Sequence, residues 1–275
     1  MSKNFITRTI TALCFVVIMV GSIMLGRIYY AAVMYFVLVA SIYELSKLIK
    51  IKDPNFSLVS SLILGSATYL IIALVAFKII SSSALILLVV IAFSAILIEL
   101  FRKKTDPIIN VSTALFSIIY TAIPLALSLF LFTDIGETVF EKRILILGYF
   151  FIIWVYDTGA YIVGSIFGKN KVDVEISPLK TWEGCLGGAF FAIITALILS
   201  KYFSILNTCQ WIILSIIISI TAVMGDFLES LFKRSVNVKD SGKLLPGHGG
   251  VLDRFDSTLM SMPFVFCYLF FILYY

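Results

Sequence analysis

The stretch that decides the fold runs from residue 144 to residue 167 and reads ILILGYFFIIWVYDTGAYIVGSIF. Its apolar residues are continuous rather than alternating, which favours a helix over a membrane β-strand. A helix needs about 20 such residues to cross the hydrocarbon core of a bilayer. Asp157 lies near the middle of this stretch, where a charged side chain costs about 2.5–3.5 kcal/mol on insertion scales. The stretch therefore predicts a membrane-spanning helix that carries a costly acid.

Similar apolar runs occur throughout the 275-residue chain. Hydrophobic residues make up 61% of the sequence and charged residues 13%, whereas soluble domains average about 45–50% and 25%. This composition excludes an ordinary soluble enzyme, a disordered chain and a secreted disulfide scaffold. The predicted fold is all-α, a polytopic integral membrane protein with about nine transmembrane helices. Their approximate bounds are 7–25, 28–47, 56–79, 82–101, 108–132, 144–167, 184–204, 209–232 and 255–275.

The distribution of basic residues predicts the orientation of the chain in the membrane. If the amino terminus is cytoplasmic and the spans alternate, 16 of the 21 lysines and arginines fall in cytoplasmic segments. Short cytoplasmic loops carry such an excess in membrane proteins. The amino terminus is therefore expected inside and the carboxyl terminus outside, which places loops 168–183 and 233–254 in the cytoplasm.

Polar residues divide the chain into two unequal parts. Residues 157–275 hold 9 of the 16 acids and 11 of the 16 glycines. We therefore predict a transmembrane scaffold of about five helices at 1–143 and a catalytic part of about four helices at 144–275. Four scattered cysteines and a single histidine argue against a zinc site or a disulfide framework. No internal repeat supports an inverted-repeat transporter.

The loop 168–183 contains the sequence Ser-Pro-Leu-Lys-Thr-Trp at 177–182. Three lysines and two hydroxyl side chains lie beside glycines in this loop, a composition that suits phosphate groups. Pro178 is a good first residue for a short helix with Ser177 as its cap. The alternative is a plain capped helix that leads back into the membrane. Asp157, in the preceding span, is either functional or structural, as a partner for a lysine or in a hydrogen bond between packed helices.

The most specific pattern lies between residues 225 and 256. Asp226, Glu229 and Lys233 are spaced i, i+3 and i+7, so they share one face of a helix. Asp253 and Asp256 stand three residues apart at the start of the last span. Carboxylates from two helices can therefore converge at the membrane surface, where hard oxygen ligands suit Mg²⁺. The alternative, a basic loop that binds anionic lipid heads, leaves the acids unexplained.

This pattern resembles the signature of the phosphatidate cytidylyltransferases, also called CDP-diglyceride synthases. The signature is met here at Ser230, Lys233-Arg234, Lys239-Asp240, Pro246, His248-Gly249-Gly250 and Asp253-Arg254-Phe255-Asp256. Two upstream elements of that family also match, at residues 157–161 and 177–182. The resemblance covers about residues 150–275 by motif. It implies transfer of CMP from CTP to phosphatidic acid, giving CDP-diacylglycerol and pyrophosphate in phospholipid biosynthesis.

The resemblance and the acidic pattern together predict the site residues. The expected catalytic residues are Asp226, Lys233, Arg234, Lys239, Asp253 and Asp256. The expected substrate-binding residues are Ser177, Lys180, Thr181, Ser230, His248, Gly249, Gly250 and Arg254. Mg²⁺ is expected at Asp226, Asp253 and Asp256, with a second cation of unknown identity left open. Asp157 either binds metal or orients Lys180, and the sequence does not decide between these roles.

The expected partners are CTP, phosphatidic acid and the lipid bilayer, with no nucleic acid, and a homodimer is left open. The expected location is the cell inner (cytoplasmic) membrane, with several passes and the active site facing the cytoplasm. Two alternative functions remain at this point. One is a cytidylyltransferase for another lipid phosphate, of archaeal type or with a polyprenyl chain. The other is a cation transporter that uses the same intramembrane acids as an ion path.

Overall fold

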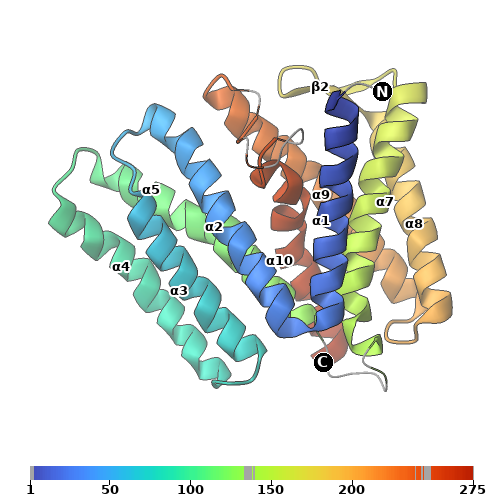
Figure 1. The fold of residues 1–275 in the computed structure, drawn as a ribbon, viewed down its shortest axis with the longest axis horizontal. Coiled ribbons are helices and arrows are strands. Elements are labelled where there is room, and N and C mark those ends of the chain that lie inside the picture. Colours follow the sequence, from blue (N-terminus) through green and yellow to red (C-terminus); the bar gives the residue numbers. More distant parts are fainter. Residues whose placement is uncertain are drawn as a thin grey trace. The chain divides into compact units, whose positions relative to one another are not determined.

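The structure is a computed structural model and describes residues 3–132, 138, 140–238, 240–242, 244 and 249–274. Within these residues the protein is built of helices, apart from one short hairpin (Figure 1). Eight helices of the described part are long and apolar enough to cross a membrane, and a shorter apolar helix covers Thr9–Leu25. The predicted all-α, polytopic membrane fold is therefore confirmed.

Each predicted span corresponds to helical structure. The main helices are α1 Lys3–Leu25, α2 Arg27–Lys52, α3 Leu58–Ala76, α4 Leu87–Arg102, α5 Pro107–Ser117, α6 Ile123–Leu127, α7 Ile144–Phe167, α8 Trp182–Tyr202, α9 Thr208–Ser235 and α10 Leu252–Tyr274. A 3₁₀ turn at Ser82–Ile86 precedes α4, and another at Glu141–Arg143 precedes α7. The bounds follow the apolar runs because a helix satisfies its own backbone groups, as a bilayer requires.

The fifth predicted span, 108–132, is not one continuous α-helix. A π-helical turn at Ile118–Ala122 separates α5 from α6, and a 3₁₀ turn at Ser128–Leu131 follows α6. Pro124 explains the interruption, because proline has no N–H to donate and its ring collides with the carbonyl four residues earlier. A widened turn next to it relieves that collision.

The chain forms two compact units. The first comprises Met1–Phe130 and Ser235–Phe255, and in it α2, α3, α4 and α5 pack against one another in chain order (Figure 1). Polar side chains join its helices: the Tyr69 hydroxyl donates to the Ala31 carbonyl at 2.8 Å, and the Tyr30 hydroxyl donates to Ser128 Oγ at 2.9 Å. Hydrogen bonds of this kind hold helices together where apolar burial does not distinguish a neighbouring helix from lipid.

The second unit comprises Leu131–Arg234 and Asp256–Tyr275. Its most extensive packing joins α7 and α8, which lie side by side in Figure 1. A Cβ on Gly188 would lie 2.8 Å from the Tyr156 carbonyl oxygen, so only glycine allows this approach. Trp211 of α9 is fully buried beneath Gly148 of α7. The functional division at residue 143 is a separate prediction, which the packing does not test.

The prediction that a short helix begins at Pro178 is wrong. Loop 168–183 contains an antiparallel hairpin of β1 Lys171–Asp173 and β2 Ser177–Thr181. Asp173 Oδ1 accepts the backbone N–H groups of Glu175 and Ile176 at 2.9 Å each, which closes the turn. Thr181 is extended and caps α8 instead, since its side-chain oxygen accepts the Gly184 N–H at 3.2 Å.

A buried carboxylate from α2 holds the segment that leads into α10. Glu44 is completely buried, and its Oε2 accepts a hydrogen bond of 2.8 Å from the backbone N–H of Leu252, the first residue of α10. The Ser241 hydroxyl donates to the same oxygen at 3.5 Å. Gly242 and Gly250 border the carboxylate so closely that a Cβ on either would collide with it. Glu44 therefore caps the N-terminus of α10 by accepting a backbone N–H, a role that a side chain at the N-cap position normally has.

Removing this acceptor should destabilise the protein measurably. In Glu44→Ala the buried Leu252 N–H loses its partner, and an unsatisfied buried group costs about 1–3 kcal/mol. Glu44→Gln keeps an acceptor oxygen and should lose less. Thermal unfolding in detergent micelles measures both variants, with Glu175→Ala in the exposed hairpin turn as the control. Parent-like melting of Glu44→Ala, together with unchanged hydrogen exchange at Leu252, would contradict the capping role.

Candidate active site

Three acids gather in the second unit. Asp226 and Glu229 come from α9 and Asp256 from α10, and one carboxylate oxygen of each lies within 4.8 Å of the other two. Glu229 is 1% exposed and Asp256 is 8% exposed, whereas the side chain of Asp226 is 42% exposed. Two buried acids and one accessible acid thus share a small volume. Hard oxygen donors at this spacing have the chemistry that Mg²⁺ requires.

The acids meet because α9 and α10 approach closely at Gly225. A Cβ on Gly225 would collide with the backbone carbonyl of Asp256 and lie 2.9 Å from Met260 Cβ. The Ser257 hydroxyl donates to the Ala222 carbonyl at 3.4 Å and so joins the two helices one turn away. Asp256 Oδ1 accepts the N–H of Ser257 at 2.6 Å. Close backbone contact therefore brings Asp256 beside the acids of α9.

Lys180 forms an ion pair with the accessible acid. Its Nζ lies 2.7 Å from Asp226 Oδ2, and the same ammonium stands 4.3 Å from the centre of the Phe227 ring. Strand β2 carries Lys180, so the hairpin rather than a helix sets its position. The 21% exposure of its side chain leaves it accessible to a ligand. Lys180 is therefore placed where an incoming phosphate would meet both the ammonium and the acid cluster.

Further charges act on the buried Asp256. Asp226 and Asp157 repel its carboxylate, and Lys180 attracts it. Asp157 is an exposed residue of α7. Among these four described groups, three acids face one lysine, and a divalent cation would offset that excess of negative charge.

Two other predicted residues contact the acids of α9. Lys233 forms an ion pair with Glu229 one helical turn away, and this pair offsets the cost of burying the Glu229 carboxylate. The Ser230 hydroxyl donates to Asp226 Oδ1 at 3.5 Å. Lys233 and Ser230 thus support the acids from their own helix, as the i, i+3 and i+4 spacing predicts.

Asp253 lies at the start of α10, three residues before Asp256, and belongs to the first unit. Its Oδ2 accepts the Gly250 N–H at 2.8 Å and the Ser241 N–H at 3.3 Å. Gly249 has a φ of 86°, a left-handed conformation that glycine adopts without strain. Asp253 therefore organises the glycine-rich segment before α10, and its metal-binding role stays a prediction.

The remaining predicted residues have varied surroundings. Thr181 is 3% exposed and its oxygen accepts the Gly184 N–H, so it caps α8 within the structure. Ser177 begins β2 and is half-buried. Arg234 and Arg254 are exposed at the end of α9 and the start of α10. Lys239 and His248 lie outside the described residues.

Two acids that were not predicted as site residues contact predicted ones or the segment that carries them. Glu229 completes the carboxylate cluster, although its spacing already placed it on the face of Asp226. Glu44 holds the segment around Asp253 through Leu252 and Ser241. The sequence did offer a signal for Glu44, because it is an acid inside an apolar run. Inserting such an acid into a membrane costs free energy unless the acid has a partner, so a structural or functional role could be expected.

Comparison with known proteins agrees with the geometry. Residues 6–272 match the model of the cytidylyltransferase family. A phosphatidate cytidylyltransferase of Staphylococcus aureus (strain COL) is 34% identical over 261 residues, which cover 93% of this chain and 95% of that protein. Proteins of the same name are 40% identical over 177 residues in Staphylococcus saprophyticus and 43% identical over 134 residues in Haemophilus influenzae. These last matches cover 63% and 47% of this chain.

The family match extends over the helices that carry the acid cluster as well as over the amino-terminal helices, where the sequence offered only a hydrophobic layout. It agrees with the resemblance inferred from the motifs at 157–161, 177–182 and 230–256. An acidic cluster beside a lysine, on a polytopic membrane fold, is compatible with transfer of a nucleotide to a lipid. The chain belongs to the cytidylyltransferase family.

Proposed function

We propose that this protein transfers CMP from CTP to phosphatidic acid, producing CDP-diacylglycerol and pyrophosphate for phospholipid biosynthesis. The observation that carries the proposal is the match to a phosphatidate cytidylyltransferase over 93% of this chain and 95% of that relative. The membrane fold supports it, because the acceptor is a lipid that does not leave the bilayer. The enzyme is thus a nucleotidyltransferase with one soluble and one membrane substrate.

The reaction brings two anionic substrates together. An oxygen of the phosphatidate phosphate forms a bond to the α-phosphorus of CTP, and the bond from that phosphorus to the bridging oxygen breaks as pyrophosphate leaves. The acceptor is already an anion at neutral pH, so no strong general base is required. Neutralising and positioning the phosphates are therefore the main tasks of the protein.

The acid cluster fits a magnesium ion, because it offers three carboxylate oxygens within 4.8 Å of one another. Asp226, Glu229 and Asp256 would hold the ion, and Asp253 is kept as a further ligand on the strength of the signature. Bound Mg²⁺ would supply positive charge to the phosphates as negative charge develops on the leaving group. A second cation remains part of the proposal, with its identity open.

Basic residues complete the phosphate site. Lys180, held 2.7 Å from Asp226, would pair with a CTP phosphate when the nucleotide approaches the acids. Lys233 balances the buried Glu229, and this pairing keeps the acid charged and oriented. Ser177, Ser230, Arg234 and Arg254, together with Lys239 and His248, remain proposed substrate contacts from the signature.

The protein is a multi-pass membrane protein, and we place it in the inner (cytoplasmic) membrane with the site facing the cytoplasm, where CTP is available. The excess of basic residues in the segments assigned to the inside supports this orientation. Proposed partners are CTP, phosphatidic acid and bilayer lipid, with no nucleic acid. A homodimer stays part of the proposal as an open alternative.

Replacing the acids of the cluster should stop turnover without unfolding the protein. Asp226→Asn and Asp256→Asn each remove a charge but keep the side-chain shape, so a lost metal ligand should lower kcat at least about a hundredfold, equivalent to about 2.7 kcal/mol. Melting temperatures without Mg²⁺ should stay equal or rise, since like charges no longer repel. Pyrophosphate release from CTP and phosphatidate measures the rate.

The matched control is Asp106→Asn at the exposed residue that precedes α5, where φ is 57°, a conformation that asparagine tolerates well. Adding Mg²⁺ should raise the melting temperature of the parent and of this control, because a ligand that binds the folded state stabilises it. Adding Mg²⁺ should raise the melting temperature of Asp256→Asn much less. A cluster variant that keeps a rate within a few-fold of the parent would contradict the metal site.

The orientation can be tested by thiol labelling in a variant whose four native cysteines are replaced. Val238→Cys lies in the loop between α9 and α10, and Ser204→Cys lies in the loop between α8 and α9. An impermeant thiol reagent added to intact cells should label Ser204→Cys but reach Val238→Cys only after the membrane is opened. The reverse pattern would overturn the proposed topology.

A further inference from the structure

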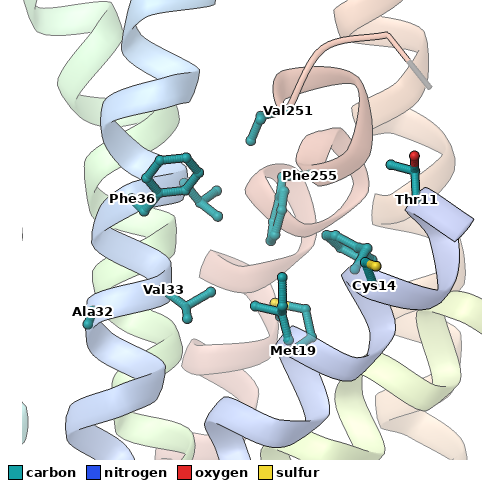
Figure 2. A pocket seen from close by; sticks show the side chains of 11 residues that line it. Thr11, Cys14, Met19, Ala32, Val33, Phe36, Val251 and Phe255 are labelled. Carbon is teal, nitrogen blue, oxygen red and sulfur yellow. The ribbon is translucent and has the colours of Figure 1, made fainter. Parts of the chain in front are cut away.

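An apolar groove in the first unit lies between α1, α2 and the start of α10. Its cavity volume is about 390 Å³. Phe15 and Met19 line it from α1, Val33 and Phe36 from α2, and Phe255 from α10. Figure 2 shows Phe255 and Val251 directed into the space between the α1 and α2 side chains. All lining residues are apolar except Thr11 and Cys14.

The groove adjoins the signature segment of the enzyme. Val251 directly follows Gly250, whose N–H binds the Asp253 carboxylate at 2.8 Å. Phe255 stands between Asp253 and Asp256 in the sequence and is 1% exposed. Its ring packs edge-on against Phe15 of α1, with 5.6 Å between ring centres. The groove therefore borders the part of the signature segment that contains the proposed metal ligand Asp253, which belongs to the same unit.

The chemistry of the groove limits what it can hold. Its walls offer no charged group, so a nucleotide or a phosphate would lose its hydration there without compensation. A second recess of the first unit, between α4 and α5, is lined by Glu99, Lys103 and Lys104 and includes no signature residue. Of these two recesses, the first is thus the apolar one that reaches α10.

We infer that this groove binds one acyl chain of the lipid substrate, an inference that rests on the proposed function. In phosphatidic acid the acyl chains begin a few bonds from the phosphate, so a phosphate held near α10 places a chain against the adjoining apolar surface. The chain moves from an apolar bilayer into an apolar groove, and the hydrophobic effect therefore changes little on binding. The groove acts by its shape, selecting chains that fill it.

Narrowing the groove should change the preference for chain length. Val33→Phe adds a ring to the half-buried wall of α2, and we expect kcat/KM for dipalmitoyl phosphatidate to fall about tenfold, the effect of poor fit in an apolar pocket. The kcat/KM for dioctanoyl phosphatidate should fall less than about threefold, because its shorter chains still fit the narrowed groove. The KM for CTP should not change. The assay measures pyrophosphate release in mixed micelles at a fixed surface fraction of lipid.

The matched control is Val90→Phe, the same change at a side chain of α4 that is 59% exposed and is not among the residues that line the groove. Its ratio of dipalmitoyl to dioctanoyl kcat/KM should equal that of the parent. Val33→Ala widens the groove and provides an independent variant if the bulky one does not fold. It should shift the ratio in the opposite direction to Val33→Phe.

Photocrosslinking gives a readout that does not depend on activity. Phosphatidate with a photoreactive group at the end of one acyl chain should attach to peptides of α1 and α2 that line the groove, and excess unlabelled phosphatidate should compete. Equal attachment of a photoreactive phosphatidylcholine would show a general lipid contact and overturn the inference. Unchanged chain-length ratios in both Val33 variants of an active enzyme would also overturn it. An inactive parent enzyme would instead contradict the proposed function.

Discussion

Three carboxylates packed within 4.8 Å of one another, two of them buried, form the constraint on which the candidate site depends. Acids in a membrane protein repel each other and lose hydration, so their burial requires compensation. Here Lys180 pairs with Asp226, and Lys233 pairs with Glu229. Gly225 allows the helix contact that brings Asp256 to them. A cluster maintained against this cost is expected to bind a cation.

The two lysines reach the cluster from different kinds of structure. Lys233 is one turn from Glu229 on the same helix, so its position follows from helix geometry alone. Lys180 is on β2, whose register with β1 and whose junction with α8 fix its location. Glu183 supports this junction by accepting the backbone N–H groups of Lys169 and Asn170 at 3.2 Å. Lys180, the proposed partner of an incoming phosphate, thus lies on a hairpin whose end joins α8 directly and whose start is bound by Glu183.

The segment before α10 depends on partners from outside itself. Among its described residues, the Gly250 N–H is bound by Asp253 and the Leu252 N–H by Glu44. A loop with several glycines has high conformational freedom when unfolded, and these carboxylates restrict it. The amino-terminal helices therefore contribute to the signature segment directly, through Glu44 on α2, as well as forming a membrane scaffold.

The sequence by itself determined the helices and the family. Long apolar runs must form helices in a bilayer, because only a helix or a closed barrel satisfies the backbone there. The spacing of Asp226, Glu229 and Lys233 placed them on one face, and the signature from Ser230 to Asp256 indicated the chemistry. Tertiary structure decided which faces meet. It added Glu44 to the signature segment, through a contact between residues far apart in the chain that the periodicity of one helix does not show. The hairpin in place of the helix expected at Pro178 and the π turn near Pro124 have local causes, the Asp173 turn and the missing proline N–H, which apolar spacing does not register.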